Sequence, residues 1–489
     1  MTGKIYVFGI GGTGARVIKS LTMLAGAGVP MEAEAIVPII IDPDFGNADV
    51  TRAIKQLNIY ANIRELLVFN DTSKNGFFQI SIEKAVNDYR LRLKDTKSKK
   101  FKEYIDLGNL SRANRALASI LFSETNLESE MEVGFKGNPN MGSVVLNQFT
   151  DSEDFINFAS AFNPGDRIFI ISSIFGGTGA SGFPLLLKNL RGLSSNMPNF
   201  AAIKQAPIGA ITVLPYFDVK PDEKSSINSS TFISKSKAAL KYYENNVTGN
   251  QSSVNALYYI GDLHTKQYEN EEGGDKQKNN AHIIELVSAL AIIDFMSISN
   301  QNTLLNCAIN SEGKVYAPNP VFKEFGIEND VEEILFGNLS QKTRSMLSRP
   351  MTQFILLSKY VIEHLNDASD CVWVKDNHFD NAFMTGTFMD NLSSFTNAYL
   401  EWLTEMADND RSFTPFKLSV KSSDLFNIVN GVKVDKIKDL WALGKSGYNL
   451  FDAGLNKRNS LPANLTSEQK FMELFYIVTK EIVNKKFRF

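Results

Sequence analysis

Two patterns in the chain predict an α/β fold in which a parallel sheet is followed by a long apolar helix, and the C-terminal part is expected to be mainly helical. Over the first 278 residues, short apolar runs alternate with amphipathic stretches of helical period, as parallel sheets with helical crossovers require. Residues 279–298 are apolar on most sides of a helix, which is typical of a helix buried between two layers. We therefore expect a sheet domain at 1–278, a central helix at 279–298 and a mostly helical C-terminal domain at 299–489.

Five apolar runs are the expected strands of the sheet. The first leads through a glycine-rich turn into an amphipathic helix, and the second ends at a proline between two acids, which stops a strand. In the C-terminal part, we expect helices at 341–366, 383–407 and 467–486 and short strands at 372–374 and 416–420. The strands of the sheet are expected at residues 5–10, 35–41, 167–174, 208–214 and 256–260.

The composition narrows the class of protein. The chain has 489 residues, of which 21% are charged, and a net charge of −3, so it offers no global field for wrapping a nucleic acid. Two cysteines and four histidines supply neither a zinc-binding motif nor a disulfide framework. No run approaches the ~18 apolar residues of a membrane span. We expect a bacterial-type, cytoplasmic protein that binds no nucleic acid and has no membrane span.

The first glycine-rich turn, residues 9–14, fits the pattern GxGxxG between a strand and a helix. Glycines at such a turn let the backbone approach a phosphate, and the free amides of the helix N-terminus hold its negative charge. One interpretation is a Rossmann-like dinucleotide site, with Asp42 at the end of the second strand binding the ribose hydroxyls. A tight packing turn without a ligand explains the same residues, so this pattern alone leaves both interpretations open.

A second glycine-rich turn, residues 176–182, follows another buried strand and again precedes a helix. A dinucleotide enzyme has no use for two phosphate loops. A nucleoside triphosphate does, because one helix N-terminus can hold the inner phosphates while another covers the outer ones. The candidate phosphate-binding residues are therefore Gly9, Gly11, Gly12, Thr13, Gly14, Gly176, Gly177, Thr178, Gly179, Ala180 and Ser181.

With two such turns, residues 3–298 resemble the tubulin/FtsZ superfamily, and most of all its diverged bacterial tubulin-like members. The segment 175–182 is similar to the glycine-rich signature of that family, with Phe175 where the family usually has glycine. Residues 137–142 are similar to its GNPxxG loop, which faces the outer phosphate. The resemblance implies a Rossmann-like, GTPase-type domain that binds GTP or GDP, and it leaves the presence of Mg²⁺ open.

The same resemblance implies further nucleotide contacts. It places an acidic loop after the second strand, a ribose-binding loop at 222–224, and base readers at the start of the central helix, where an amide side chain can both donate to and accept from guanine. Simpler roles compete with these: helix capping for the asparagines, pairing with Glu285 for the histidine and turn capping for the first aspartate. The implied residues are Asp42, Asp44, Gly137, Asn138, Gly142, Asp222, Glu223, Lys224, Asn279, Asn280 and His282.

The segment after the central helix departs from the family. There the family carries an acid that reaches the neighbouring subunit's nucleotide and orients the attacking water, so that hydrolysis is completed on assembly. Residues 297–306 contain amides and hydroxyls but no carboxylate, and Gln301 is a weaker means of positioning a water. We therefore leave GTPase activity open and expect hydrolysis to be weak or absent.

The leading prediction is a GTP-binding protein that self-associates head to tail into filaments or oligomers, with nucleotide at the subunit junction. The C-terminal domain departs from the small mixed sheet of the family and is a candidate surface for a protein partner. Two alternatives remain. One is a nucleotide-bound structural module of a bacterial complex, and the other is an NAD-dependent oxidoreductase that uses residues 9–14 and Asp42.

Overall fold

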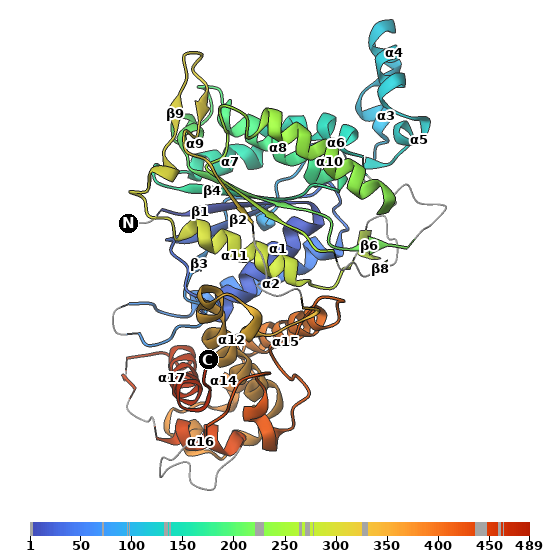
Figure 1. The fold of residues 1–489 in the computed structure, drawn as a ribbon. Coiled ribbons are helices and arrows are strands. Elements are labelled where there is room, and N and C mark those ends of the chain that lie inside the picture. The colour runs from blue at the N-terminus through green and yellow to red at the C-terminus, as the bar shows by residue number, and fades with distance from the viewer. Residues whose placement is uncertain are drawn as a thin grey trace.

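A seven-stranded parallel sheet with helices on both faces forms the centre of the structure (Figure 1), and a mainly helical part follows it. The predicted fold class is therefore confirmed. The computed structural model describes residues 3–70, 73–94, 96, 98–131, 135, 138–220, 229–263, 267–268, 274–276, 278–324, 331–435, 447–457, 461–462 and 464–489.

The strands of the sheet run in the order β11-β7-β5-β4-β1-β2-β3. Ile5 of β1 pairs with Ile36 of β2 on one side and with Arg167 of β4 on the other. From β1 the chain moves outward to β2 and β3 and then returns to β4 on the opposite side of β1, so the strand order reverses between β1 and β4. In open parallel sheets, ligands bind at the carboxyl ends of the strands beside such a reversal. The strands are β1 (Ile5–Ile10), β2 (Ala35–Ile41), β3 (Ser81–Ile82), β4 (Arg167–Ser173), β5 (Ile208–Val213), β7 (Ala256–Ile260) and β11 (Val321–Glu324).

Helices cover both faces of the sheet (Figure 1). One face carries α1 (Gly11–Gly26), α2 (Ala48–Glu65) and α11 (Ile283–Met296). The insertion with α3 (Phe101–Tyr104), α4 (Arg112–Leu121) and α5 (Glu124–Leu127) projects from one end of the molecule. The other face carries α6 (Pro139–Val145), α7 (Glu153–Ala161), α8 (Gly177–Arg191), α9 (Phe200–Gln205) and α10 (Ser229–Asn246).

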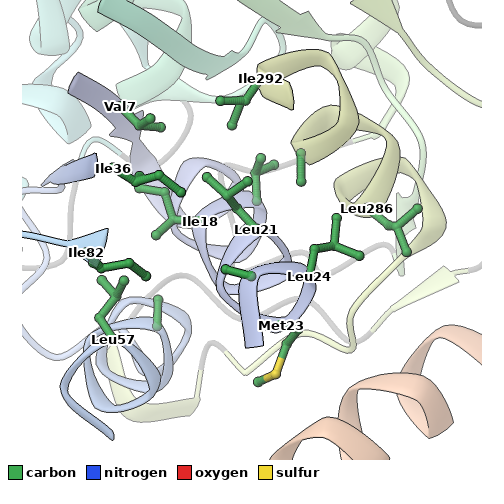
Figure 2. Close-up of a cluster of buried hydrophobic side chains, with 14 of the residues drawn as sticks. Val7, Ile18, Leu21, Met23, Leu24, Ile36, Leu57, Ile82, Leu286 and Ile292 are labelled. Carbon is green, nitrogen blue, oxygen red and sulfur yellow. The ribbon is translucent and has the colours of Figure 1, made fainter. Parts of the chain in front are cut away.

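The helix α1 lies at the centre of the apolar core. Every residue of α1 except Gly12 is buried. Figure 2 shows side chains of the sheet, α1, α2 and α11 meeting in one cluster, with Leu24 of α1 beside Leu286 of α11. Burial of a leucine side chain contributes about 1.5–3 kcal/mol relative to exposure. This packing fixes α1, and with it the first glycine-rich turn, against the sheet.

The C-terminal part packs directly on α1 and α2. Phe395 of α15 is fully buried against Gly26, where an added Cβ would lie 2.5 Å from the phenylalanine ring. The rings of Phe78 and Phe354 lie 5.0 and 5.9 Å from that of Phe395. The helices of this part are α12 (Gln341–Glu363), α13 (Val372–Asp376), α14 (Asn381–Met384), α15 (Thr387–Ala407), α16 (Tyr448–Asn456) and α17 (Ser467–Lys486). Short strand pairs outside the main sheet are β6 (Asp218–Val219) with β8 (Gln267–Tyr268), β9 (Ala308–Ile309) with β10 (Val315–Tyr316), and β12 (Glu333–Ile334) with β13 (Ser412–Phe413).

The predicted C-terminal helices are confirmed as α12, α15 and α17, but the two predicted strands are wrong. Residues 372–374 form the first turn of α13. Within 416–420, Phe416 makes only an isolated bridge to Val429. Apolar runs of three to five residues do not distinguish a strand from a buried helical turn.

The central helix is shorter than predicted, and two strands of the sheet, β3 and β11, were not predicted. The helix α11 begins at Ile283 because His282 is its N-cap, so residues 279–281 precede the helix. The edge strand β11 pairs in parallel with β7, although it follows the central helix in the chain. Its four residues are too few to show a period.

Candidate functional site

The two glycine-rich turns meet at the carboxyl ends of β1 and β4. A Cβ added at Gly11 would lie 3.6 Å from the Cβ of Thr178 and 4.0 Å from the amide nitrogen of Gly179. Gly11 has a φ of +73°, a conformation that glycine adopts without steric cost. The helices α1 and α8 lie on opposite faces of the sheet, and their N-termini therefore converge where the strand order reverses.

The glycines of the first turn have two different roles. A Cβ at Gly14 would lie 2.7 Å from the Cα of Gly9, whereas one at Gly12 would have no neighbour closer than 3.4 Å. Gly9 and Gly14 therefore let α1 sit directly on the end of β1. Gly11 and Gly12 form the surface of the turn beside the second glycine-rich segment.

The second glycine-rich turn also contains residues that pack against a strand and residues that form its surface. A Cβ at Gly179 would lie 2.5 Å from the carbonyl oxygen of Ser173, so Gly179 brings α8 close to β4. The hydroxyl of Ser181 donates to the carbonyl oxygen of Gly177 at 2.7 Å, so it is bonded within the helix. Thr178 and Ala180 are half-buried. The segment 176–178 is therefore the part of this turn that faces the first.

Side chains do not cap α1 or α8. The N-cap residues are Ile10 for α1 and Gly176 for α8, neither makes a side-chain capping bond, and neither helix has an acid in its first turn. In contrast, Asn47 caps α2 and Thr466 caps α17. The first amides of an uncapped helix are unpaired donors at the positive end of its dipole. Two such ends side by side form an anion-binding surface.

The loop predicted to face the outer phosphate lies against α8. The side chain of Asn138 caps α6, accepting from the amides of Asn140 and Met141 at 3.0 and 3.3 Å. A Cβ at Gly142 would overlap the hydroxyl of Ser181, so α6 packs tightly on the N-terminal part of α8. The structure therefore brings Asn138 and Gly142 to the site, while Gly137 and Glu223, together with Asp222 and Lys224, lie outside the described residues.

The acids after β2 are bonded within the protein. Asp42 accepts from the amide of Asp44 at 2.9 Å and from the side chain of Asn47 at 3.3 Å. Burial raises the pKa of Asp42 to about 7. Asp44 accepts from the amides of Gly46 and Gly274 at 2.9 and 2.7 Å. The carboxylate of Asp42 thus caps a turn, which was the simpler of its two predicted roles.

A buried cluster of charged side chains holds α1, the helix that follows the first turn, against its neighbouring helices. Arg16 of α1 donates to Asp49 of α2 at 2.5 Å, to Tyr216 at 2.7 Å and to Glu285 of α11. Tyr216 in turn donates to Glu285 at 2.8 Å. Burial lowers the pKa of Arg16, but Tyr216 and the two carboxylates outweigh it, so the pKa lies well above its ordinary value. Arg16 therefore stays charged and joins three helices around the glycine-rich turn.

The predicted base readers take three different positions. Asn279 donates to Asp49 through its side-chain nitrogen at 2.9 Å and through its backbone amide at 3.1 Å. Asn280 is half-buried. His282 is buried, and its Nδ1 accepts from the amide of Ile284 at 3.1 Å. The helix cap is therefore His282 and not an asparagine, and its predicted partner Glu285 completes the capping box.

Several residues of this site were not predicted. Arg16, Asp49 and Tyr216 belong to the charge cluster, yet each has neighbours in the sequence that resemble any buried helix or strand end. The one local signal was Asn47, whose position before Asp49 and a helical stretch is typical of an N-cap. The long-range pairing of these charges has no such signature in a single sequence.

Two further observations concern metals and membranes. Among the described residues, no group of three or more His, Cys, Asp or Glu side chains is arranged to hold a metal ion. In the same part of the chain, no helix is both long and apolar enough to cross a membrane.

Comparisons with known proteins give matches of structure only. No family model matches the chain, and no curated protein sequence matches it. A CetZ2 structure from Haloferax volcanii, described as a GTPgS-bound protofilament, has 13% sequence identity and a TM-score of 0.30 over 62% of this chain and 61% of its own. A GDP-bound CetZ1 monomer from the same organism has 15% identity and a TM-score of 0.31 over 62% and 64%.

An FtsZ mutant from M. jannaschii has 14% identity and a TM-score of 0.24 over 53% of this chain and 47% of its own. The present chain thus spans less than two thirds of each matched chain.

We predict that Gly14→Ala destabilises the fold while Gly12→Ala does not. The new methyl group at position 14 would overlap the backbone of Gly9, whereas the one at position 12 has room. Overpacking of this kind costs about 1–3 kcal/mol. Urea unfolding of both variants and the wild type measures the difference, and equal free energies of unfolding would contradict the assignment of Gly14 to packing.

We also predict a contribution of His282 to stability that is lost on acidification. Burial lowers the pKa of His282 to about 4 in the folded chain, below the ordinary value of about 6.5. Its contribution is therefore fully present above pH 6.5 and lost as the pH falls toward 4, where the unfolded chain takes up the proton first. His282→Asn keeps a capping side chain without this titration.

The free energy of unfolding, measured between pH 4 and 7, should fall less steeply in His282→Asn than in the wild type. His378→Asn, at a histidine outside this site with a φ of +57° that asparagine tolerates, should keep the wild-type slope. Equal slopes for His282→Asn and the wild type would show that the histidine is not buried in its neutral form.

Proposed function

We propose that the protein binds the guanine nucleotide GTP through the two glycine-rich turns at the carboxyl edge of the sheet. The observation that carries this proposal is the meeting of two uncapped helix N-termini without acids in their first turns. Each such terminus carries roughly half a positive charge. Two neighbouring helix N-termini suit a chain of three phosphates, whereas a dinucleotide fold uses a single helix N-terminus for its pyrophosphate. Backbone amides supply the attraction, so a net charge of −3 is no obstacle.

The choice of guanine depends on the segment 279–282 and on the family resemblance. Asp49 is 3.7 Å from the Cβ position of Gly12 and also holds Asn279, so this segment lies next to the first turn. The half-buried amide of Asn280 has the donor and acceptor that the guanine edge requires. The tubulin/FtsZ resemblance of residues 3–298 supports GTP or GDP over ATP.

The placement of the glycine-rich turns and of the loop after α11 at opposite edges of the sheet supports the proposal of head-to-tail self-association. At the amino end of β4, Arg167 donates to the carbonyl oxygens of Phe295 and Ile298 at 2.8 and 2.6 Å and to the side chain of Asn300. The loop after α11 is thereby held at the edge opposite the glycine-rich turns. Stacking along the strand direction would place this loop of one copy over the nucleotide of the next, which is a heterologous contact.

Weak or absent hydrolysis follows from the chemistry of that loop. Residues 297–306 present Asn300, Gln301 and Asn302 but no carboxylate. An amide can hold a water by hydrogen bonds, but it is not a general base at neutral pH. The same observation favours a second candidate function, in which the nucleotide is a static part of a partner-binding module. The oxidoreductase alternative gains no support, because the carboxylate of Asp42 is already bonded to Asp44 and Asn47.

Purified protein is expected to contain or bind GTP or GDP, and Gly177→Val is expected to weaken binding at least about tenfold by covering first-turn amides of α8. Isothermal calorimetry and chromatography of released nucleotide measure this. The control is Gly108→Val, since a Cβ at Gly108 meets nothing within 4 Å. Absence of any purine nucleotide and of binding in the wild type would overturn the proposal.

Assembly is expected to depend on the nucleotide. Negative-stain microscopy of the wild type with GTP should show filaments or rings that are absent without it. GTP turnover, measured as phosphate release, should remain slow even when the protein is assembled, because residues 297–306 supply no carboxylate. A constant monomer or fixed small oligomer under both conditions would favour the static module instead.

A further inference from the structure

The C-terminal part holds the backbone of Ala281, which lies in the middle of the segment proposed to read the base. The amide of Ala281 donates to the carboxylate of Glu405 at 3.0 Å. Its carbonyl oxygen accepts from the side chain of Asn409 at 2.9 Å. The backbone amide and the backbone carbonyl of Ala281 are therefore both bonded to side chains at the end of α15 or just after it.

Glu405 also binds the two helices that carry the nucleotide site. It accepts from Arg52 of α2 at 2.5 Å and from Lys19 of α1 at 3.3 Å. Arg52 also donates to Asp49 at 3.0 Å and to the carbonyl oxygen of Asn279. All of these groups are mostly buried, with side-chain exposures of 17% or less for the charged pairs. One carboxylate thus links α1, α2 and the segment 279–282 to α15.

A further residue after α15 also bonds to segments that follow strands of the sheet. Arg411, two residues after Asn409, donates to Asp262 at 2.7 Å and to the carbonyl oxygen of Val331 at 2.7 Å. Asp262 follows β7. The segment 405–411 therefore also contacts the loop after β7 and the chain that follows β11.

We propose that the segment 405–411 of the C-terminal part positions the base-reading segment, so that nucleotide binding and the placement of α15 regulate each other. This inference rests on the proposed GTP-binding function. Glu405 and Asn409 are positioning residues, since they bond the backbone of Ala281. A partner that shifts α15 would change the affinity for GTP, and GTP would change the affinity for that partner by the same factor.

The physical reason is that residues 279–281 lack helical hydrogen bonds of their own. They precede the cap of α11, so their position is set by Asp49 and Arg52 on one side and by Glu405 and Asn409 on the other. A buried backbone group without a partner is costly. Without Asn409, the carbonyl of Ala281 is therefore expected to turn away and carry the base contacts with it.

The test uses a ligand with a base and one without. Asn409→Ala should weaken binding of GTP about tenfold while leaving binding of inorganic triphosphate unchanged, because the phosphate turns are not touched. Asn397→Ala is the matched control, since Asn397 lies on the exposed side of α15 and bonds only within its own helix at Ser393. Asn409→Ser, which keeps a shorter donor, should give an intermediate loss and serves where the alanine variant does not fold.

Each outcome separates the two proposals. A wild type that binds neither GTP nor triphosphate overturns the proposed function and this inference with it. A wild type that binds both, with GTP affinity unchanged in the Asn409 variants, overturns the positioning role alone. An equal loss of GTP and triphosphate affinity would also overturn it, because that result reports a general loosening of the site.

Discussion

The close approach of two helices to two strands is the constraint on which the rest of the structure depends. Gly9 and Gly14 allow α1 to touch the end of β1, and Gly179 allows α8 to touch β4. Any larger residue would lift a helix from its strand and turn its N-terminus away. Because β1 and β4 are neighbours and their helices lie on opposite faces, these contacts aim two sets of unpaired amides at one place. The candidate site is thus a product of backbone packing more than of side-chain chemistry.

Local patterns in the sequence predicted most of the sheet and both glycine-rich turns. Apolar runs mark buried strands, and glycines beside them mark turns, so each is visible in a short window. The prediction of a strand at 372–374 was wrong because three apolar residues carry no distinctive local signal. The predicted start of the central helix was wrong because a histidine cap carries none either. The strand β11 was missed because its partner β7 lies about sixty residues earlier, and four residues show no period.

The buried charges show why the rest of the site could not be predicted. Arg16 pairs with Asp49 and Glu285, and Glu405 pairs with Lys19 and Arg52, so four helices are joined by ion pairs that exist only in the folded chain. Each charge alone would be costly to bury, and removal of one partner from such a pair typically costs about 3–5 kcal/mol. Their mutual satisfaction fixes the angles between the helices. The cluster thereby specifies where the first glycine-rich turn and the segment proposed to read the base lie, a property that no single segment encodes.

The strand β4 connects two surfaces that face opposite ways. At its carboxyl end is the second glycine-rich turn, and at its amino end Arg167 holds the loop after α11. Seven extended residues span roughly 23 Å, and β4 is hydrogen-bonded to strands on both sides. In the proposed head-to-tail row, this doubly paired strand would join the contact that each molecule makes with one neighbour to the contact that it makes with the other.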